Sequence, residues 1–404
     1  MTTRRLGAGD TDAAAEIIAS GGLVAVPTET VYGLGGNGLS PAAIAKIYEV
    51  KGRPSVKPVS LLVGGVCSID KYCENVPGAA YALAEKFWPG PLTLVMNARK
   101  SVPDMLLAGG DTVGLRCPSH PLTLEVIEKS GLPLAAPSAN ISGQKSPKTA
   151  GDVLDYFDKT IDAVLDGGTC AIGLESTIID LSCTPYKILR LGALSEDDIA
   201  DALVSDMYII GITGGTGSGK STALSILGSM GALTLDCDEI YHKLLAESKQ
   251  LIAEIAESFP STVSNGVLDR KALGAVVFSS SDALAALNVI THKHVMGEVI
   301  TQLRNWAMNG GRAAAVDAIA LIESGTCKLC SKTVYVTAPE SKRIRRIMER
   351  EGIGEDYAKA RISAQKPDEF FRAHCDYVLT NSGSFEEFEK QCSRLFADII
   401  PDIK

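Results

Sequence analysis

Gly214-Gly-Thr-Gly-Ser-Gly-Lys-Ser221 is the stretch that decides the fold of the second half of this chain. The β-branched apolar run Tyr208–Ile212 comes directly before it and predicts a strand, and Thr222–Ser229 directly after it predicts a helix. A strand, a glycine-rich loop and a helix in this order form a phosphate cradle, because successive backbone N–H groups point into one concavity at a helix N-terminus. The stretch therefore predicts a P-loop that binds ATP.

Individual residues of this loop have separate expected roles. Lys220 should reach the β- and γ-phosphates and is a predicted catalytic residue, and the hydroxyl of Ser221 is the predicted ligand of Mg²⁺. ATP and Mg²⁺ are accordingly the two predicted cofactors. The residues expected to bind this ATP are Gly215, Thr216, Gly217, Ser218, Gly219, Lys220, Ser221 and Thr222.

Paired carboxylates end the next apolar run, Leu233–Asp238 (LTLDCD), which predicts a strand. Asp236 and Asp238 lie two residues apart, so on an extended strand both side chains would face the same side. A carboxylate at the carboxyl end of a parallel strand can orient an acceptor hydroxyl and take its proton. An equally weighted alternative is that Asp238 is the N-cap of a helix over residues 239–246.

Several arginines follow on a predicted helix pair, in Ser341–Arg350 (SKRIRRIMER) and at Arg361. A basic helix face is ordinarily solvated surface, and without context that is the better interpretation. After a P-loop, however, such a segment is typical of the mobile lid of nucleoside-monophosphate-type kinases, whose arginines close on the transferring phosphates.

Residues 208–400 resemble the dephospho-coenzyme A kinases along almost their whole length. The stretches that carry the resemblance are Ile210–Thr222, Asp236/Asp238, Leu268–Leu273, Leu287–His292, Arg346, Arg350, Arg361–Gln365 and Cys375–Gly383. The resemblance implies ATP-dependent phosphorylation of the ribose 3′-hydroxyl of dephospho-coenzyme A, which is the last step of coenzyme A biosynthesis.

The same resemblance implies roles for particular residues. Asp238 is the expected base, Arg346 and Arg350 are the expected lid arginines, and Asp236, Asp238 and Asp317 are expected at the acceptor. One departure concerns the acceptor pocket: where the family reads D-x-P-L-L-x-E, this chain has Asp317-Ala-Ile-Ala-Leu-Ile-Glu323.

The first half contains no P-loop, so nucleotide binding there must come from scattered groups. Pro27–Gly35 follows the strand-like run Gly22–Pro27 and carries hydroxyls, a carboxylate and glycines. Lys51-Gly-Arg-Pro54 and Lys57 place three cations in a segment broken by Gly and Pro, and an irregular loop can converge them on a polyphosphate. An exposed basic turn is the competing interpretation of that segment.

Further polar groups follow other strand-like runs in this half. They lie in Thr112–Arg116, Ala135–Asn140 and Gly173–Thr177 and at Arg190. An arginine at a strand end suits bidentate capture of a carboxylate. Each of these segments also fits an ordinary turn or cap.

Taken together, residues 10–195 resemble the YrdC-type L-threonylcarbamoyladenylate synthases. The resemblance implies a twisted α/β fold around a large, positively lined cavity, and a reaction of L-threonine, bicarbonate and ATP that gives threonylcarbamoyl-AMP and pyrophosphate for the threonylcarbamoyladenosine modification of tRNA. Lys51 and Arg53 are its implied catalytic residues. The implied threonine site is Thr30, Arg116, Ala136 and Ser176, and the implied ATP site is Arg53, Lys57, Thr112, Ser138, Asn140, Ser146 and Arg190.

Composition limits the classes of partner. The chain has 404 residues and a net charge of −9, which argues against a broad grip on nucleic acid. We expect small-molecule substrates, with tRNA-modification proteins as a further class of partner, no membrane and no stable nucleic-acid binding. Ten cysteines without an apolar leader predict free thiols in the cytoplasm, although Cys327 and Cys330 could form half a metal site or a redox pair.

The chain is therefore predicted to have two α/β domains, with the boundary in the acidic helical segment Ala193–Asp206. Residues 1–205 form the YrdC-like domain with its cavity, and residues 206–404 form the P-loop kinase domain, a parallel α/β fold with a lid. A rival hypothesis makes the first half an RNA-binding module fused to a kinase for another small hydroxyl substrate. An aromatic content of 5% disfavours it, because RNA binding relies on base stacking.

Overall fold

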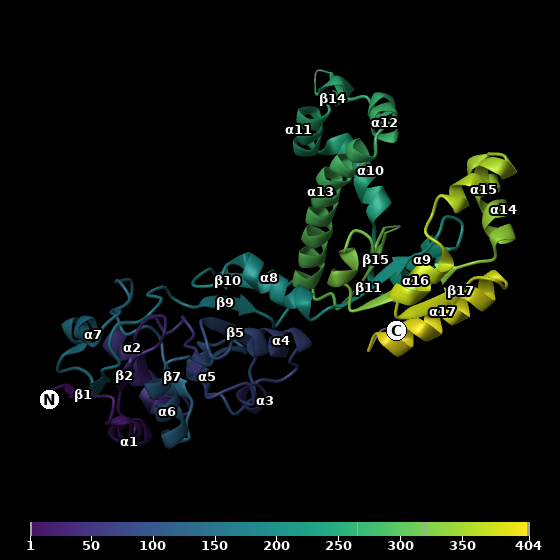
Figure 1. Cartoon of the computed structure of the whole chain (residues 1–404). Helices are drawn as coiled ribbons and strands as arrows, with labels where there is room; N and C mark the ends of the chain where they lie inside the picture. The colour runs from purple at the N-terminus through teal and green to yellow at the C-terminus, as the bar shows by residue number, and fades with distance from the viewer. Residues whose placement is uncertain (1, 265, 319, 402–404) are drawn as a thin grey trace. The chain divides into compact units, whose positions relative to one another are not determined.

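The computed structural model describes residues 2–264, 266–318 and 320–401, and its backbone divides into two compact units (Figure 1). The first unit comprises Met1–Asp206 with Met308–Gly310, and the second comprises Met207–Ala307 with Gly311–Lys404. Each unit has its own sheet with helices around it. The predicted α/β class is therefore confirmed for both halves.

The first unit is built on a ten-stranded mixed sheet in the order β1-β8-β2-β3-β7-β4-β6-β5-β9-β10. Pairs such as β1 with β8 and β5 with β9 are parallel, whereas β2 with β3 and β5 with β6 are antiparallel. The strands are β1 (Arg4–Leu6), β2 (Val24–Val26), β3 (Gly33–Asn37), β4 (Leu61–Leu62), β5 (Leu92–Asn97), β6 (Thr112–Arg116), β7 (Leu134–Ala135), β8 (Ala163–Leu165), β9 (Thr177–Asp180) and β10 (Lys187–Arg190).

Helices join these strands and bury their apolar faces on the sheet. Residues such as Ile18 of α1 and Val126 of α6 pack in one core with Val24 and Leu165 of the strands. The helices are α1 (Thr11–Ala19), α2 (Pro41–Lys51), α3 (Ser68–Tyr72), α4 (Gly78–Phe87), α5 (Asp104–Leu107), α6 (Pro121–Ser130), α7 (Ala150–Phe157) and α8 (Glu196–Ser205). The helix predicted within residues 193–206 is confirmed as α8, whose capping box on Ser195 fixes its start.

One expectation about the basic segment of this unit is corrected. Lys51 does not lie in an irregular loop, because it is the last residue of α2. Gly52 ends that helix with φ 56° and ψ 36°, a left-handed conformation that glycine adopts without strain. The side chains of Lys51 and Arg53 thus leave the chain from a helix end and from the turn after it.

The second unit contains a five-stranded sheet that is parallel throughout, in the order β12-β15-β11-β16-β17. Its strands are β11 (Tyr208–Thr213), β12 (Leu233–Asp236), β15 (Ala313–Asp317), β16 (Lys332–Thr337) and β17 (Tyr377–Thr380). The helices α9 (Lys220–Ser229) and α17 (Phe385–Ile399) pack against each other and share a core with the sheet, in which Leu227 and Phe396 are fully buried. The predicted strand before the glycine-rich loop and the helix after it are both confirmed.

The strand before the paired carboxylates ends earlier than expected. β12 stops at Asp236, and α10 (Cys237–Glu247) begins directly after it, so an extended strand through Asp238 is wrong. The alternative N-cap at Asp238 is also wrong, because the N-cap is Asp236: its Oδ1 accepts from the N–H of Asp238 at 2.8 Å and of Glu239 at 3.2 Å. The free N–H groups of a helix start compete successfully with strand extension here.

Two helical segments complete the second unit (Figure 1). One consists of α10, α11 (Lys249–Ser258), α12 (Arg270–Phe278), the first part of α13 (Ser281–Met308) and a two-stranded sheet of β13 (Val263–Ser264) and β14 (Val267–Leu268), with a small core of its own. The other contains the predicted helix pair, confirmed as α14 (Glu340–Glu351) and α15 (Glu355–Ser363), followed by α16 (Asp368–His374). Short 3₁₀ turns lie at Pro260–Thr262 and Thr326–Leu329.

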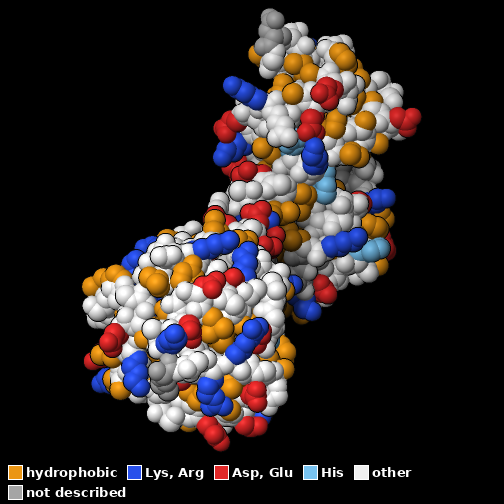
Figure 2. Space-filling view, turned by 90° about the vertical axis from the view of Figure 1, so that its left-hand side faces the viewer, with side chains coloured by type: hydrophobic (Ala, Val, Ile, Leu, Met, Phe, Trp, Pro, Cys, Tyr) orange, Lys and Arg blue, Asp and Glu red, His pale blue; other side chains and the backbone are white. Residues whose placement is uncertain are grey.

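The surface and the thiols add two observations. On the face drawn in Figure 2, Lys and Arg side chains are interspersed with Asp and Glu side chains. All ten cysteines are free thiols. Among the described helices, none combines the length and the apolar character that crossing a membrane requires.

Candidate active sites

The glycine-rich loop of the second unit adopts a shape that only glycine allows at three positions. Gly214, Gly217 and Gly219 have φ values of 151°, 79° and 106°, which L side chains rarely adopt. A Cβ at Gly214 would also lie 2.2 Å from the carbonyl oxygen of Val336. Gly219 caps α9, so Lys220, Ser221 and Thr222 form its first turn at the carboxyl end of β11. All eight residues predicted to bind ATP thus lie in one strand–loop–helix connection.

One of the two predicted lid arginines contacts this loop. Arg346 donates from Nη1 to the carbonyl oxygens of Gly217 at 3.1 Å and Ser218 at 3.4 Å, and from Nη2 to the side chain of Asn381 at 3.1 Å. Arg350 lies elsewhere, in an ion pair with Glu351 at 2.6 Å, and Arg361 donates to the same carboxylate. The structure therefore brings Arg346 to the loop and leaves Arg350 and Arg361 on Glu351.

Three carboxylates lie near one another and near Lys220, two at the ends of neighbouring strands and Asp238 in the first turn of α10. Asp236 of β12 and Asp317 of β15 are register partners in the sheet. Burial is the largest cause that raises the pKa of Asp317; with Lys220 opposing it and Asp236 and Asp238 adding to it, the pKa is raised to about 7. Burial and Asp236 likewise raise the pKa of Asp238. A raised pKa makes a carboxylate a stronger base toward an acceptor hydroxyl.

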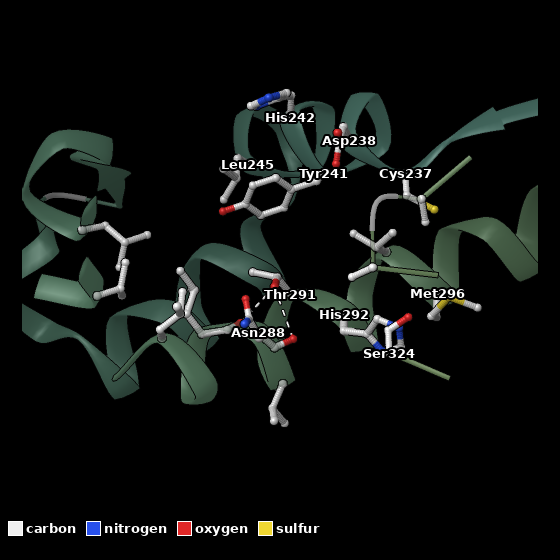
Figure 3. Close-up of a pocket in the computed structure, with 18 of the residues that line it drawn as sticks. Cys237, Asp238, Tyr241, His242, Leu245, Asn288, Thr291, His292, Met296 and Ser324 are labelled. Atoms are coloured by element: carbon white, nitrogen blue, oxygen red, sulfur yellow. Dashed lines mark hydrogen bonds between the residues drawn. The ribbon is translucent and has the colours of Figure 1, made fainter. Parts of the chain in front are cut away.

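A large cavity of about 790 Å³ lies beside these carboxylates (Figure 3). Its walls come from α10, α12, α13 and the segment after β15, including Ala318, Ala320 and Glu323 of the departure from the family pattern, while Ile319 lies outside the described residues. In Figure 3, Tyr241 reaches from α10 toward Asn288 and Thr291 of α13, and Asp238 lies on α10 one turn before it. Most of the wall is apolar, which suits an acceptor with a long apolar part.

Most of the residues that line this acceptor-side cavity were not predicted from the sequence. Tyr241, His242 and Arg270 supply polar groups to its wall. A hydrogen bond of 3.1 Å joins Nε2 of His292 to Oγ1 of Thr326. These residues were hard to predict because they lie on helices, where a side chain that lines a cavity has the same sequence spacing as a core side chain. Arg270 and His292 belonged to stretches that carried the resemblance, but neither was given a role.

The first unit contains a cavity of about 390 Å³ in which most of the predicted synthase residues meet. The residues that the structure brings to its wall are Lys51, Arg53, Lys57, Arg116, Ala136, Ser138, Asn140, Ser176 and Arg190. Thr30 lies behind the wall, where its hydroxyl accepts from Arg116 Nη2 at 2.8 Å. Ser146 donates to Glu175 of the wall at 2.9 Å. Thr112 begins β6 at the opposite end from Arg116, so the structure does not bring it to this wall.

The cations of this cavity are held in different ways. Lys51 is 1% exposed and donates from Nζ to the carbonyl oxygens of Ser138 and of Asn140, the latter at 2.6 Å. Burial, helped by the charge of Arg53, lowers the pKa of Lys51 to about 7. Arg53 donates to the carbonyl oxygens of Lys57 at 3.1 Å and Pro58 at 2.8 Å. Much of the hydrogen-bonding capacity of Lys51 is therefore used in shaping the wall.

Two carboxylates among these cations were not singled out from the sequence. Glu29 forms an ion pair with Arg116 at 2.7 Å, and Glu175 forms one with Arg190. Both lie inside segments already quoted, and the carboxylate of Pro27–Gly35 was noted there without a role, so charge was the signal that could have identified them. They leave the cavity cationic but partly neutralised, which limits the cost of gathering like charges.

Two family models match the chain. The model described as Telomere recombination, which covers Sua5, YciO and YrdC proteins, matches residues 16–192, and the model described as Dephospho-CoA kinase matches residues 208–387. The chain therefore belongs to both families, with a Sua5/YrdC-type domain in its first half and a dephospho-CoA kinase domain in its second half.

Named relatives match each half separately. Threonylcarbamoyl-AMP synthase from Pyrococcus abyssi (strain GE5 / Orsay) is 46% identical over 186 residues, which are 46% of this chain and 55% of that protein. The protein of the same name from Bacillus subtilis (strain 168) is 40% identical over 200 residues, 48% of this chain and 57% of that protein. Dephospho-CoA kinase from Corynebacterium efficiens is 36% identical over 200 residues, 49% of this chain and 100% of that protein. The chain thus spans about half the length of the two synthases and the whole length of the kinase.

Proposed function

We propose that the chain is a bifunctional enzyme. Its first domain joins L-threonine, bicarbonate and ATP into threonylcarbamoyl-AMP and pyrophosphate, and its second phosphorylates the 3′-hydroxyl of dephospho-coenzyme A with ATP. The observation that carries the proposal is the presence of two separate anion-binding sites, a loop of backbone amides at the start of α9 and a cavity lined by Lys51, Arg53, Lys57, Arg116 and Arg190. Membership of two ATP-using families supports it.

In the first domain, catalysis would rest on charge neutralisation and positioning. Carboxylated threonine is an anion that must attack the anionic α-phosphate of ATP, so cations around both groups lower the barrier. Arg116, with Thr30 behind it, would bind the threonine carboxylate next to Ser176 and Ala136. Arg53 and Lys57 would bind the triphosphate, and Lys51 would hold the 138–140 turn in place. The leaving pyrophosphate takes the negative charge of the broken phosphoanhydride.

The remaining predicted residues of this domain would bind the nucleotide less directly. Ser138, Asn140 and Arg190 line the cavity, and Ser146 would act through Glu175. A role for Thr112 would require the nucleotide to extend along β6. We propose that the product passes to tRNA-modification proteins, because a mixed carbamic–phosphoric anhydride hydrolyses readily and must be consumed soon after its release.

In the second domain, the loop would bind the phosphates of ATP and the apolar cavity would bind the acceptor. Asp238 would take the proton of the acceptor 3′-hydroxyl as its oxygen attacks the γ-phosphorus, while ADP leaves, and the nearby Asp236 raises the pKa of this base. Lys220 would neutralise charge on the transferring phosphoryl group. Arg346 would hold the loop, and Arg350 would reach the phosphates only after leaving Glu351.

The residues at the loop also fit Mg²⁺. Ser221 is an exposed residue at the start of α9, and Asp317 has a buried side-chain oxygen without a hydrogen-bond partner in the described part of the chain. Mg²⁺ prefers such oxygen ligands and completes its shell with water and phosphate oxygens. When bound, it would neutralise charge on the β- and γ-phosphates.

We further propose a cytoplasmic location, because free cysteines persist in a reducing compartment.

One assay tests both activities. The full chain is given ATP·Mg²⁺ with threonine plus bicarbonate, and separately with dephospho-coenzyme A. Pyrophosphate release in the first mixture and 3′-phosphorylation in the second are expected. Tight binding of structured RNA without threonine-dependent pyrophosphate release would overturn the first half, and preference for another nucleoside acceptor would overturn the second.

A further inference from the structure

Arg343 lies on α14, but its guanidinium reaches the phosphate loop. Its Nε donates to the carbonyl oxygen of Thr216 at 3.0 Å, and its Nη2 donates to the side-chain oxygen of Gln365 at 2.8 Å. The same Gln365 oxygen accepts from the N–H of Thr216 at 3.1 Å, and Gln365 Nε2 donates to Thr216 Oγ1 at 2.7 Å. The N–H, the carbonyl group and the hydroxyl of one loop residue are thus all bound by two side chains from outside the loop.

The approach of Arg343 to the loop is close. Arg343 is 9% exposed, and a Cβ at Gly215 would lie 2.1 Å from its Nη2. A Cβ at Gly217 would lie 2.9 Å from the carbonyl oxygen of Arg343. The glycines of the loop therefore serve a second purpose besides their φ values, which is to let a buried guanidinium pack against the loop backbone.

The partners of Arg343 are unusual for a buried arginine. A buried charge is costly unless hydrogen bonds or a counter-charge compensate it. The hydrogen bonds of the Arg343 guanidinium end on neutral oxygens, those of Thr216 and Gln365. Among the described residues, these hydrogen bonds bring Arg343 no counter-charge, and its guanidinium packs against the loop backbone, where a bound polyphosphate would supply negative charge.

Of the neighbouring arginines on α14, Arg346 also donates to the loop, whereas Arg345 does not contact it. Arg346 supports the next part of the loop through Gly217 and Ser218. Arg345 points to solvent, with its side chain 72% exposed and within 3.5 Å of Glu349. Arg343 was not among the predicted lid residues, because its position in the run SKRIRRIMER gives no sign that it turns inward.

We propose that Arg343 is a positioning residue for nucleotide binding, which acts with Gln365 by holding Thr216 so that the loop is shaped for phosphate before ATP arrives. The N–H of Thr216 is already bound to Gln365, so Thr216 contributes through the orientation of its neighbours. Preorganised donors bind tightly because little ordering remains to be done on binding. The inference rests on the proposed function only as far as the loop binds a nucleotide polyphosphate.

The test uses the full chain with Arg343→Met, Gln365→Leu and the double variant, and Arg345→Met as the matched control on the same helix. In the kinase assay, each single variant should raise the KM for ATP about tenfold, the effect of losing one or two hydrogen bonds to a charged group. The KM for dephospho-coenzyme A and the melting temperature should stay within error of the parent. The double variant should be no worse than the poorer single one, because both act on Thr216. Arg345→Met should match the parent.

An ATP titration by calorimetry separates failure of this inference from failure of the proposed acceptor. The kinase site is defined as the ATP site that Lys220→Ala removes, so its affinity is measurable whatever the acceptor is. Weaker ATP binding at that site in Arg343→Met and Gln365→Leu supports the inference. Unchanged affinity in both folded variants overturns it, as does an equal rise in both KM values. If Arg343→Met does not fold, Gln365→Leu, which leaves α14 unaltered, decides by the same criteria.

Discussion

The side chains of Arg116 and Glu29 form an ion pair of 2.7 Å inside the first domain, where they are 9% and 10% exposed. Glu29 also accepts from the N–H of Ser119 at 2.9 Å, so its carboxylate holds Arg116 in one orientation. We expect Arg116→Ala to raise the threonine concentration needed for pyrophosphate release by at least about tenfold, because a charge-assisted contact to the threonine carboxylate is lost. Initial rates over a threonine series measure this.

The same substitution leaves Glu29 buried without its counter-charge, which costs about 3–5 kcal/mol of stability. The double variant Glu29→Gln/Arg116→Met removes both charges and serves as the control. It should recover most of the free energy of unfolding without recovering threonine use. An unchanged threonine requirement in Arg116→Ala would show that the threonine site lies elsewhere.

Lys220→Ala should lower phosphotransfer to dephospho-coenzyme A by about 10²-fold or more, because a preorganised positive charge on the transferring phosphoryl group is lost. Threonine-dependent pyrophosphate release should stay within error of the parent, since the residues that line the first cavity lie between Thr28 and Arg190. Both reactions are measured on the same preparation. Loss of both in a folded variant would refute the independence of the two sites.

Gly274→Leu should narrow the acceptor cavity. Gly274 lies on α12 and lines the cavity, and the nearest atom to an added Cβ is a ring carbon of Phe278 at 3.8 Å, so the helix tolerates a side chain there. We expect the KM for dephospho-coenzyme A to rise about tenfold, the usual effect of a few misplaced methyl groups in an apolar pocket, and the KM for ATP to stay the same. Gly297→Leu, on α13 with open space around the added Cβ, is the matched control.

Asp317 should make the second domain less stable as pH rises. Its pKa is about 7 when folded, against an ordinary value of 3.8, so the folded chain holds this proton more tightly than the unfolded chain. The free energy of unfolding should therefore fall by about 1.4 kcal/mol per pH unit between about pH 4 and about pH 7 from this group alone, and level off above. Asp317→Asn removes that slope and should be the more stable chain at neutral pH.

Fluorescence can follow this effect in one domain of the full chain. The chain has two tryptophans, and Trp306 lies in the second unit, so a Trp88→Phe background reports on that unit. Urea unfolding is then compared, at several pH values, between this background and the same background carrying Asp317→Asn. Equal pH dependence in both would mean that the burial of Asp317 does not favour its protonated form.

The two anion sites differ in how far sequence could predict them. The P-loop is local, since its shape follows from left-handed glycines within eight contiguous residues, and the flanking strand and helix were predicted correctly. The first cavity is assembled from segments far apart in the chain. Arg116, Ser138 and Ser176 were placed there by resemblance, because no local pattern distinguishes them from turn or cap residues.

What sequence reasoning missed depends on side chains that turn inward. Lys51 was expected in a loop, yet α2 carries it into contact with the carbonyl oxygens of residues 138 and 140, a contact between distant segments. Asp236 rather than Asp238 caps α10. The sequence alone did not distinguish the two, because helix boundaries are uncertain by a residue or two. Arg343 belongs to the same class, because it is 9% exposed whereas Arg345 of the same basic run has a side chain that is 72% exposed.

The length of α13 links the acceptor cavity to distant parts of the kinase domain. Its 28 residues give it a length of roughly 40 Å at the usual rise per residue. Every fourth residue from Leu287 to Ala307 is buried, so one continuous stripe runs from the acceptor cavity to the far end of the helix. Binding of an acceptor against Thr291 and Val295 should therefore restrict the motion of the whole helix. It should slow proteolytic cleavage of α13 several turns away from the cavity.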